Sequence, residues 1–594
     1  MSLHTNNHLD PKTWNKVNRL YIKKAISEFS HELLIKPVLV ERKDSWGVYE
    51  LKSDDKEVTY QFNAQKLHFD HWYIDPDSIR KGTGGTLSLI AFIMEFKESL
   101  QIPEPMLPTY LEEISCTLYG AAYKYGGEWL TSAELANATF QQIEGAMIEG
   151  HPCFIANNGR IGFSVSDYHQ YSPEASQGFK ILWLAGHKDN AIFTSINTLS
   201  YEQLVEQELG KKQLKLFEGQ LLERGLNPSD YYFFPMNPWQ WENKLSYVFA
   251  TDIATNQLVL LGEGEDTYQP QQSIRTLFNK SNPEKYYVKT ALSIQNMGFM
   301  RGLSPYYMQS TPEITMWISD LLKEDQYLRS CGFSMLGEIA TMGYINRNFE
   351  PMGRTNIYNK MLSVLWRESP LGYLKANQKP MTMAALLHVD PDGNALLPHL
   401  IQTSGKDEAT WIRSYLSSYL APLLHCFYAY DLVFMPHGEN IILILEDNLP
   451  VGMFMKDITE EVVTFRPNEN YPDKVQRLVV EAEDEVKVLS IATDVFDCFF
   501  RFLGQVIVAH CEMTERTFWE LVADCIVTYQ QLHPEFEEKY KSCDLFADSF
   551  IRSCLNRLQL NNHKQMVDLS NPVNGLQFIG RIDNPLATLH SVNA

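Results

Sequence analysis

The sequence contains no uninterrupted apolar run of about 18 residues, the length that a membrane-spanning helix needs. Its longest apolar stretches, LSLIAFIMEF at 87–96 and CFFRFLGQVIVA at 498–509, are long enough only for helices of a protein core. The first 14 residues lack a basic segment followed by an apolar one, which is the pattern of a secretion signal. These absences predict a cytoplasmic protein that has no membrane partner.

Paired cysteines and an excess of positive charge are also missing. The nine cysteines are scattered and form no Cys-x-x-Cys pair, which argues against a disulfide framework and against a zinc site. The net charge is −22, and contacts with nucleic-acid phosphates need clustered Lys and Arg. We therefore expect free thiols, no nucleic-acid partner, and a local basic pocket wherever a polyanion binds.

Several common catalytic motifs are absent. KGTGGT at 81–86 is not followed by Gly-Lys-Ser/Thr, so it is not a typical phosphate-binding loop. SHELL at 30–34 has no second histidine for a zinc protease, and no Gly-x-Ser-x-Gly motif indicates a serine nucleophile. Nothing in the sequence therefore predicts a covalent acyl-enzyme.

A chain of 594 residues is too long for one core, and we expect three or four domains. Residues 11–35 have apolar side chains at helical spacing, 45–53 and 58–64 read as strands, and 86–147 reads as helical. Short β-branched or aromatic runs between 150 and 300 predict a sheet. Helices are expected from about 315 to 370 and again from 485 onward, with domain boundaries near 147 and 370.

The segment 271–302, QQSIRTLFNKSNPEKYYVKTALSIQNMGFMRG, is rich in cationic and hydroxyl side chains. In VKTALSIQ, strict alternation predicts that Lys289 shares one strand face with Ala291, Ser293 and Gln295. A lysine on a buried strand is costly unless an anion compensates it. Arg275, Arg301, Ser273 and Thr276 lie near it along the chain, so the set could bind a polyphosphate. A surface hairpin with solvated cations is the alternative.

The segment 431–457, DLVFMPHGENIILILEDNLPVGMFMKD, places apolar strands around a tight turn. Glu439 and Asn440 lie in the turn, and Asp457 follows the third strand, so their oxygens would meet at the ends of adjacent strands. Mg²⁺ takes one or two carboxylates together with phosphate oxygens and water. The alternative is a turn that uses Asn and Gly for backbone reasons only.

The loop GHPCFIANNGRIGF, 150–163, concentrates His151, two amides, a glycine and Arg160. It is either a polar connector or a set of donors for an anionic ligand. Together with YSPE, SIRT, KTALSIQNMGFMRG, PHGEN and KD, in this order over residues 12 to 580, it resembles the IucA/IucC family. These are siderophore synthetases that work without a non-ribosomal peptide synthetase. Each motif is weak alone, and the set is specific.

The resemblance implies an α+β fold of three domains in a cupped hand: a mostly helical thumb at 1–147, fingers at 148–370 and a palm at 371–594. The fingers would contain an antiparallel sheet at the nucleotide site, and the C-terminal region would be helical. A homodimer is implied by the family alone.

The resemblance also implies an ATP-dependent ligase that forms an amide through an acyl-adenylate and releases AMP and pyrophosphate. It assigns ATP binding to Ser273, Ile274, Arg275, Thr276, Lys289 and Glu439. It assigns Mg²⁺ to Glu439, Asn440 and Asp457. The implied catalytic residues are Lys289, Arg301, His437, His151 and Arg160.

Within the family, HPCFIANNGRIGF, IQNMGFMRGLSPYYM and MPHGEN are most similar to the type C branch, whose members make hydroxamate macrocycles. Citrate-using members differ at Phe154, Ile155, Asn158, Asn237 and Glu439. The implied substrate is therefore an N-hydroxy-N-succinyl diamine, joined head to tail and cyclised.

Two other functional classes are compatible with these residues. His-Gly-Glu-Asn followed by Asp457 resembles the catalytic loop and metal-binding Asp of kinase-like phosphotransferases acting on small molecules. Against this, Glu replaces the catalytic Asp and no Gly-rich loop precedes a strand lysine. The other class is a nucleotide-binding scaffold without catalysis.

Overall fold

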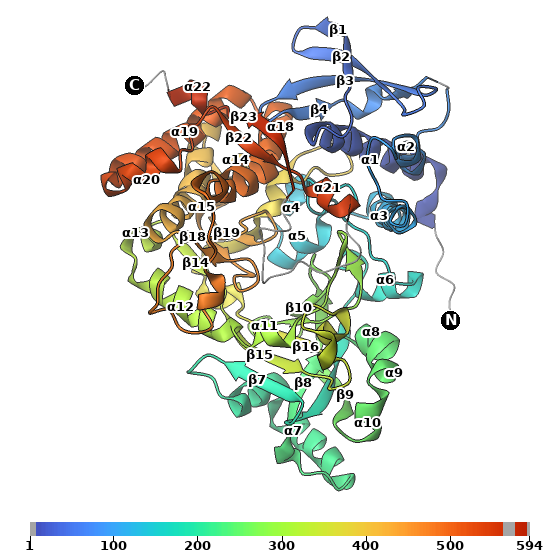
Figure 1. The fold of residues 1–594 in the computed structure, drawn as a ribbon, viewed down its shortest axis with the longest axis vertical. Helices are drawn as coiled ribbons and strands as arrows, with labels where there is room; N and C mark the ends of the chain where they lie inside the picture. Colours follow the sequence, from blue (N-terminus) through green and yellow to red (C-terminus); the bar gives the residue numbers. More distant parts are fainter. Residues whose placement is uncertain (1–6, 83, 562–576, 591–594) are drawn as a thin grey trace.

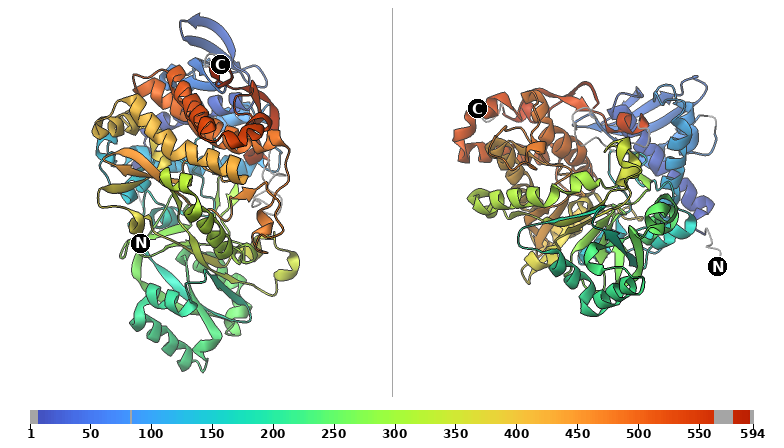
Figure 2. Two further views of the ribbon diagram at one scale, coloured as in Figure 1. Left: turned by 90° about the vertical axis from the view of Figure 1, so that its left-hand side faces the viewer. Right: turned by 60° about the horizontal axis from the view of Figure 1, so that its bottom comes forward.

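The computed structural model describes residues 7–82, 84–561 and 577–590. Helices and mostly antiparallel sheets alternate along the chain. In Figure 1 the N-terminal part (blue) lies at the upper right, the middle (green) at the bottom and the C-terminal part (orange and red) at the upper left. The turned views of Figure 2 keep these three parts around one shared centre. In the part of the chain that is described, no helix is long and apolar enough to cross a membrane.

The N-terminal part combines two long and three short helices with a five-stranded sheet. Asp10 starts the first helix because its carboxylate accepts hydrogen bonds from the backbone N–H groups of Lys12 and Thr13. The helices are α1 (Pro11–His31), α2 (Leu89–Glu95) and α3 (Leu107–Gly126), followed by α4 (Ser132–Leu135) and α5 (Phe140–Ala146). The strands are β1 (Val38–Lys43), β2 (Trp46–Lys52), β3 (Thr59–Leu67), β4 (His71–Ile74) and β5 (Arg80–Lys81). The predicted helix at 11–35 and both predicted strands are confirmed.

An antiparallel sheet of eight strands dominates the middle of the chain, in the order β7-β15-β16-β11-β10-β9-β6-β8. Its strands are β6 (Phe179–His187), β7 (Ala191–Ser195), β8 (Tyr231–Met236), β9 (Leu258–Pro270), β10 (Thr276–Asn279), β11 (Tyr287–Thr290), β15 (Glu338–Tyr344) and β16 (Ser363–Arg367). Around it lie α6 (Val165–Tyr171), α7 (Tyr201–Glu223), α8 (Pro238–Gln240), α9 (Ser246–Val248), α10 (Ala250–Ala254) and α11 (Pro305–Met308). The sheet predicted for this region is confirmed.

Two sequence expectations for this region are wrong in part. Helices were expected from about 315 to 370. The first part of this range is helical, in α12 (Thr311–Glu324) and α13 (Gln326–Ser330), but β15 and β16 lie in the rest. Every residue of both strands is buried, so they show no alternation of apolar and polar positions. The strand predicted through VKTALSIQ ends at Thr290, because the backbone N–H of Ser293 bonds to the side-chain oxygen of Gln240 (2.8 Å) instead of to a neighbouring strand.

The C-terminal part packs a four-stranded sheet, in the order β14-β20-β19-β17, against helices. Its strands are β14 (Phe333–Met335), β17 (Gln378–Thr382), β19 (Ile441–Glu446) and β20 (Leu449–Met455). The helices are α12 (Thr311–Glu324), α13 (Gln326–Ser330), α14 (Leu396–Ser404), α15 (Glu408–Tyr430), α16 (Asp484–Lys487), α17 (Leu489–Ile491), a π-helix at Ala492–Phe500, α18 (Arg501–His510), α19 (Glu515–Leu532), α20 (Glu537–Ser542), α21 (Leu555–Leu560) and α22 (Ala587–His590). Three short pairs complete the described strands: β12 (Gln295–Asn296) with β13 (Phe299–Met300), β18 (Leu432–Val433) with β21 (Val463–Thr464), and β22 (Ser549–Ser553) with β23 (Phe578–Asp583).

Three large hydrophobic clusters stabilise these parts. One joins α1–α3 to the five-stranded sheet, and a second fills the eight-stranded sheet and its helices. The third joins α14, α15, α18 and α19 to the four-stranded sheet, and it includes α12 and β14. The segment 311–335 therefore packs with the C-terminal part, although the sequence-based boundary at 370 assigned it to the middle part.

The residues of the candidate site come from two sheets. In the eight-stranded sheet, Thr276 of β10 lies opposite Lys289 of β11. In the four-stranded sheet, β19 and β20 pair so that Asn440, just before β19, and Asp457, just after β20, lie at the same edge. This edge is where the sequence predicted that the oxygen ligands would meet.

The packing of β20 against β14 depends on a glycine. A Cβ atom on Gly332 would lie 2.5 Å from the carbonyl oxygen of Val451, and the residue has φ of +67°. We predict that Gly332→Ala lowers the free energy of unfolding by about 2–4 kcal/mol, from left-handed strain plus overlap. Gly405→Ala is the control, because Gly405 has the same φ and no atom within 4 Å of the added Cβ. It should cost only about 1–2 kcal/mol in urea unfolding, and equal losses would contradict the prediction.

Candidate active site

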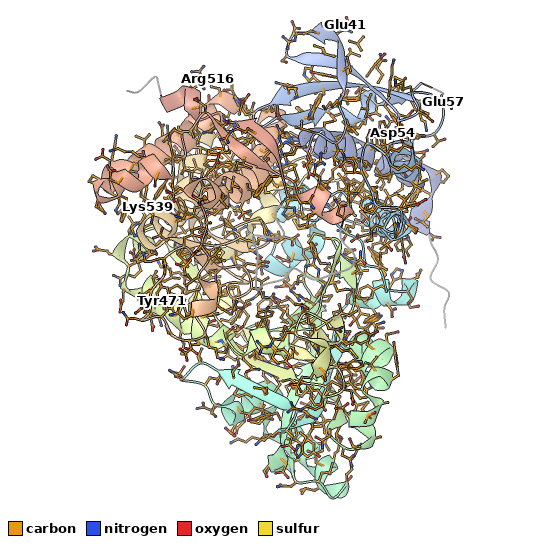
Figure 3. The ribbon with its side chains drawn as sticks, in the orientation of Figure 1. Glu41, Asp54, Glu57, Tyr471, Arg516 and Lys539 are labelled. Carbon is orange, nitrogen blue, oxygen red and sulfur yellow. The ribbon has the colours of Figure 1, made fainter. Side chains whose placement is uncertain are left out.

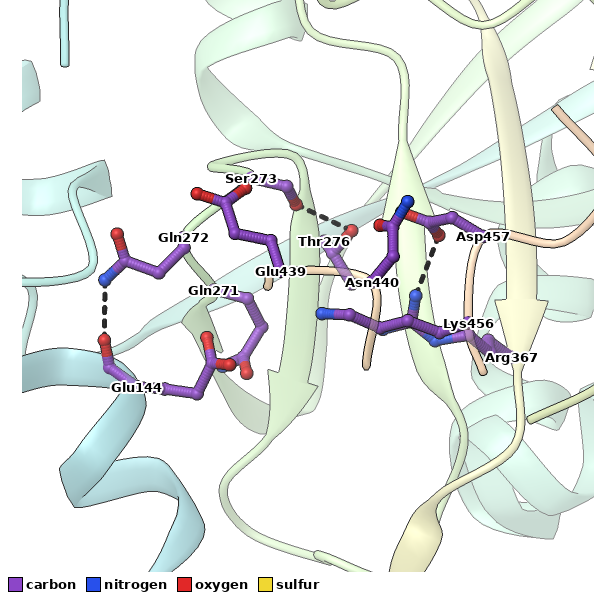
Figure 4. Close-up of a pocket in the computed structure, with 10 residues that line it drawn as sticks. All are labelled: Glu144, Gln271, Gln272, Ser273, Thr276, Arg367, Glu439, Asn440, Lys456 and Asp457. Carbon is purple, nitrogen blue, oxygen red and sulfur yellow. Dashed lines mark hydrogen bonds and ion pairs between the residues drawn. The ribbon is translucent and has the colours of Figure 1, made fainter. Parts of the chain in front are cut away.

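A polar pocket lies between the two sheets, with about 350 Å³ of empty space that is partly open to solvent. Figure 4 shows its walls, which come from α5, from the turn between β9 and β10, from β16 and from the loops beside β19 and β20. The lining residues are Glu144, Gln271, Gln272, Ser273, Thr276, Arg367, Glu439, Asn440, Lys456 and Asp457. Five of these belong to the predicted site.

Lys289 lies at the centre of an ion-pair network at the back of the pocket. Its ammonium is 3.3 Å from Asp457 and 3.0 Å from Glu460, and the residue is only 2% exposed. Burial alone would lower the pKa of Lys289, but the charges of Asp457 and Glu460 outweigh it and raise the pKa. Lys289 is therefore a compensated buried cation, and the alternative of a solvated surface hairpin is excluded.

Two arginines extend this network. Arg367 donates to the Oδ1 atom of Asp457 at 2.9 Å, and Arg275 lies 3.2 Å from Glu460. Burial alone would raise the pKa of Asp457, but the charges of Lys289 and Arg367 outweigh it and hold the pKa below its ordinary value. The Nε atoms of both arginines are buried and lack a partner among the described residues. Both guanidinium groups therefore have donor capacity left for a ligand.

The turn that precedes β10 has an unusual backbone. Ile274 has φ of +58°, a conformation that is rare for a β-branched residue, and its side chain is completely buried. The neighbouring hydroxyls of Ser273 and Thr276 are hydrogen-bonded at 2.9 Å and line the pocket. Strained conformations of this kind gather at ligand-binding sites.

Acidic and amide oxygens also line the pocket, on the loops beside β19 and β20. Both side-chain hydrogen bonds of Asn440 to described residues use its Nδ2 group, which leaves Oδ1 available as a ligand. One of these bonds goes to Glu461, whose pKa is raised to about 8 by burial and by the charge of Asp457. Glu439 forms no ion pair with the described part of the chain, and it lines the pocket. The pocket thus presents hard oxygen ligands beside its cations.

Arg301 is held beside the network by a hairpin that α3 supports. Its Nη2 group donates to the backbone oxygen of Asn296 (3.0 Å), and its pKa is lowered to about 10 by burial and by the charge of Arg275. Glu113 of α3 accepts the N–H of Gly298 at 2.7 Å and the amide of Gln295 at 3.3 Å. Glu113 therefore ties α3 to the hairpin that ends at Arg301.

The two predicted histidines contact each other. The rings of His151 and His437 are edge-to-face, with 5.4 Å between their centroids. Burial lowers the pKa of both histidines, and the repulsion that would arise if both were protonated lowers the pKa of His151 further. Both rings are therefore neutral at pH 7. The Nδ1 atom of His437 is buried without a partner among the described residues. It can therefore bond to a ligand.

Arg160 lies apart from the ion-pair network. It forms a two-pronged pair with Glu174 (2.5 and 3.0 Å) and also donates to Asn158 at 2.9 Å. A Cβ atom on Gly159 would lie 2.3 Å from the Cγ atom of Glu113, so the loop can approach α3 only with glycine there. Arg160 fixes the shape of the loop that carries His151, and its buried Nε atom has no partner among the described residues.

The structure brings together most of the predicted residues and adds others. The predicted residues that line the pocket are Ser273, Thr276, Glu439, Asn440 and Asp457. Those that lie next to it are Lys289, Arg275, Arg301, His437 and His151. The residues that the sequence reasoning missed are Arg367, Lys456, Glu460, Glu461, Glu338, Glu144, Gln271 and Gln272. Glu460 and Glu461 could have been predicted from the sequence, because a buried lysine needs nearby anions and these two adjacent acids follow Asp457 closely. The buried strand β16 gave no such signal for Arg367.

Sequence comparisons identify the family. Residues 139–388 match the model of the IucA/IucC family, and residues 409–568 match one described as ferric iron reductase FhuF-like transporter. The chain is 48% identical to putrebactin synthase of Shewanella sp. (strain MR-4) over 595 aligned positions, covering 100% of this chain and 94% of the relative. This chain belongs to the IucA/IucC family. It is thus one of the siderophore synthetases that work independently of non-ribosomal peptide synthetases.

Solved structures share the fold of this IucA/IucC synthetase. Petrobactin biosynthesis protein AsbB of Bacillus anthracis superposes with a TM-score of 0.88 at 23% identity, covering 100% of this chain and 99% of that one. ATP-bound aerobactin synthetase IucA of Klebsiella pneumoniae gives 0.73 at 17% identity, covering 96% and 99%. The mixed helix and antiparallel-sheet fold expected from the sequence is confirmed.

The pocket of this synthetase fits a metal-bound triphosphate. Lys456 lines it, and its ammonium forms no hydrogen bond or ion pair with described residues, so a cation is available in addition to the spare arginine donors. No group of three or more His, Cys, Asp or Glu side chains is arranged for a metal within the described ranges. Two carboxylates and one amide oxygen match the donor set that Mg²⁺ completes with phosphate oxygens and water.

Glu113 should make the stability of this synthetase depend on pH. Burial raises its pKa to about 7, above an ordinary value near 4.5, so the folded state holds a proton that the unfolded state loses. This contribution is complete below pH 4.5 and is lost as the pH rises through 7. We predict that Glu113→Gln becomes more stable relative to wild type between pH 4.5 and 8, by up to about 3 kcal/mol. Urea unfolding at several pH values measures this, and the exposed neighbour Glu112→Gln is the control. Parallel pH curves for wild type and Glu113→Gln would contradict it.

Proposed function

We propose that the chain adenylates the carboxylate of an N-hydroxy-N-succinyl diamine and condenses it with an amine. Repeated condensation and ring closure would give a macrocyclic hydroxamate siderophore. The observation that carries the proposal is a pocket that combines compensated cations with hard oxygens, in a chain 48% identical to a putrebactin synthase. The kinase-like alternative is not favoured, because the relatives are synthetases.

The proposed chemistry has two steps. A carboxylate oxygen attacks the α-phosphorus of ATP, and the bond to pyrophosphate breaks. The amine then attacks the acyl carbon, the bond to AMP breaks, and the nitrogen loses a proton. Neither step needs a protein nucleophile, so the side chains contribute by positioning and by stabilising charge.

We assign the triphosphate to Ser273, Arg275, Thr276 and Lys289, with Ile274 fixing the turn. Arg367 of β16 adds charge on the same wall, and Lys456 adds charge from the loop that carries Asp457. Lys289 and Arg275 would exchange their carboxylate partners for phosphate oxygens. This exchange conserves the charge compensation that burial demands, so the network can open without leaving a bare cation.

Mg²⁺ would be held by Glu439, Asn440 and Asp457. The ion would supply charge neutralisation for the departing pyrophosphate. Asp457 would become available when the phosphates take over Lys289 and Arg367. Its lowered pKa keeps it ionised as a ligand at neutral pH.

Arg301, His437 and His151 would receive the carboxylate to be activated. Arginine suits this task because its planar fork can meet both carboxylate oxygens, and the unpartnered Nε of Arg301 faces no competing acceptor among the described residues. The two neutral histidines add hydrogen bonds and no charge. Arg160 would act through the loop, by holding His151 in place.

We further propose the thumb, fingers and palm arrangement for 1–147, 148–370 and 371–594, with a cytoplasmic location where ATP is available. The three large hydrophobic clusters support three units, except that the segment 311–335 packs with the C-terminal unit. The shared centre in Figure 2 supports a site built by all three.

The central test is the nucleotide product. With ATP, Mg²⁺ and N-hydroxy-N-succinyl putrescine or cadaverine, the protein should release AMP and pyrophosphate and form an amide, measured by chromatography and mass spectrometry. Release of ADP would overturn the proposal. Lys289→Gln should lower AMP formation about 100- to 1000-fold, because charge stabilisation of the reacting phosphates is lost. Lys285→Gln is the control, since Lys285 also loses an ion pair (Asp266, 2.8 Å), but outside the pocket. A scaffold without catalysis would form no AMP in wild type.

A homodimer is proposed through β1, which is an edge strand paired with β2 alone among the described strands. Val38, Leu39 and Val40 are 65%, 43% and 55% exposed, an apolar run that edge strands rarely leave open. Figure 3 shows Glu41, on the same strand, at the outer end of the molecule. A second copy could therefore pair with β1 about a two-fold axis.

We predict that Leu39→Lys combined with Val40→Lys converts a dimer of 68.4 kDa chains into monomers, because like charges would face each other across the axis. Light scattering after size-exclusion chromatography measures the mass. Val451→Lys, at an exposed strand position elsewhere, is the control. A dimer that persists in the double variant would exclude β1 as the interface.

A further inference from the structure

A second group of cations lies on the thumb side of the active-site loop. Lys24 of α1 donates to Glu149 (3.2 Å) and to the backbone oxygen of His151 (3.3 Å). Lys124 of α3 donates to the backbone oxygen of Ile148 at 3.0 Å. Lys23 lies beside them, close enough for the charges of Glu149 and Lys24 to affect its pKa. Two ammonium groups thus contact loop residues 148–151, and Lys23 is next to one of them in α1.

This group has too little negative charge of its own. In the described part of the chain, Glu149 is the carboxylate paired with Lys24, and neither Lys23 nor Lys124 forms an ion pair. Lys124 is only 8% exposed, and one of its three donor hydrogens is used. Burial lowers its pKa to about 8. A buried ammonium with spare donors and no carboxylate partner is costly, and a bound anion would relieve this cost.

A histidine near these lysines also has an unpartnered ring atom. His388 is 7% exposed, and its Nε2 atom has no hydrogen-bond partner among the described residues. It lies close enough to Lys124 and Glu149 for both to influence its pKa. Buried polar atoms are almost always satisfied, so this atom also indicates a missing ligand group.

The lysine group is next to the proposed acyl site and separate from it. Lys24 bonds to the backbone of His151, whose ring contacts His437. None of the three lysines lines the pocket between the sheets. A ligand could therefore hold one end at Arg301 and His437 while another anionic group reaches the lysines.

We propose that Lys24 and Lys124, with Lys23 beside them, form a subsite for the free carboxylate of the acceptor, the molecule whose amine attacks the activated acyl group. This inference rests on the proposed function. In head-to-tail joining, donor and acceptor carry the same carboxylate, and only the donor's is activated. A second cationic subsite binds the acceptor's carboxylate and thereby directs its amine toward the adenylate.

Ring closure distinguishes this subsite from a general effect on activity. When a linear dimer closes on itself, its one carboxylate is already converted to the adenylate, so no second carboxylate is present. The lysine subsite therefore contributes to the joining of two molecules and contributes nothing to ring closure.

The experiment uses the full chain with a donor whose amine is acetylated, so that it can be activated but cannot attack. The acceptor is N-hydroxy-N-succinyl cadaverine, either as free acid or as methyl ester. Wild type should prefer the free acid in kcat/KM. Lys24→Met and Lys124→Met should lower that preference about 10- to 100-fold, the range for a charge-assisted hydrogen bond. Two activities should be unchanged in both variants. One is the cyclisation of a synthetic linear dimer, and the other is donor-dependent AMP formation in the presence of hydroxylamine.

Lys16→Met is the matched control, because Lys16 lies on the same helix and donates to the backbone oxygen of Pro391 at 2.6 Å. It should leave the preference for the free acid intact. The subsite is overturned if the variants lower adenylation, ring closure and ester condensation by the same factor as acid condensation, or if the acid preference is unchanged. If wild type forms no AMP from the donor, the proposed function fails first, and that result is visible before any variant is compared.

Discussion

Charge compensation of Lys289 is the constraint on which the candidate site depends. A lysine buried on the central strand of an eight-stranded sheet must have anions, and Asp457 and Glu460 supply them from a loop more than 160 positions away. Because removing one member of a buried ion pair leaves the other uncompensated, at a cost of several kcal/mol, the two sheets are held in one relative position. The pocket is the space that remains between them.

The same pairing explains how one pocket can be stable when empty and selective when filled. Each cation on the β10–β11 wall already has a carboxylate, so a bare anion gains little by entering. A triphosphate that brings its own divalent ion offers the cations new oxygens and gives Asp457 a new charge to bind. The spare donors on Arg275, Arg367 and Lys456 favour this exchange further.

The sequence predicted those parts of the structure whose signal is local. Alternation and turn residues located β19, β20 and the turn at His437, and the cost of burying Lys289 correctly required nearby anions. It did not show that Glu460 would provide one, because nothing local specifies which distant acid folds onto a strand. The strands β15 and β16 were missed since both faces are buried, which removes the alternation on which strand prediction relies. The role of Glu113 depended on a contact between a helix and a hairpin 185 positions apart, which no spacing rule contains.

Helix α3 connects two features that the sequence keeps apart. Glu113, which supports the hairpin of Arg301, and Lys124, in the second cationic group, are eleven residues apart and both buried. Eleven residues are close to three full turns, so both side chains leave the same side of the helix about 16 Å from each other along its axis. A rigid helix of this kind works as a molecular ruler. Under the proposed chemistry, it would sort diamine-derived units by length, since a unit too short to span the interval could not engage both ends at once.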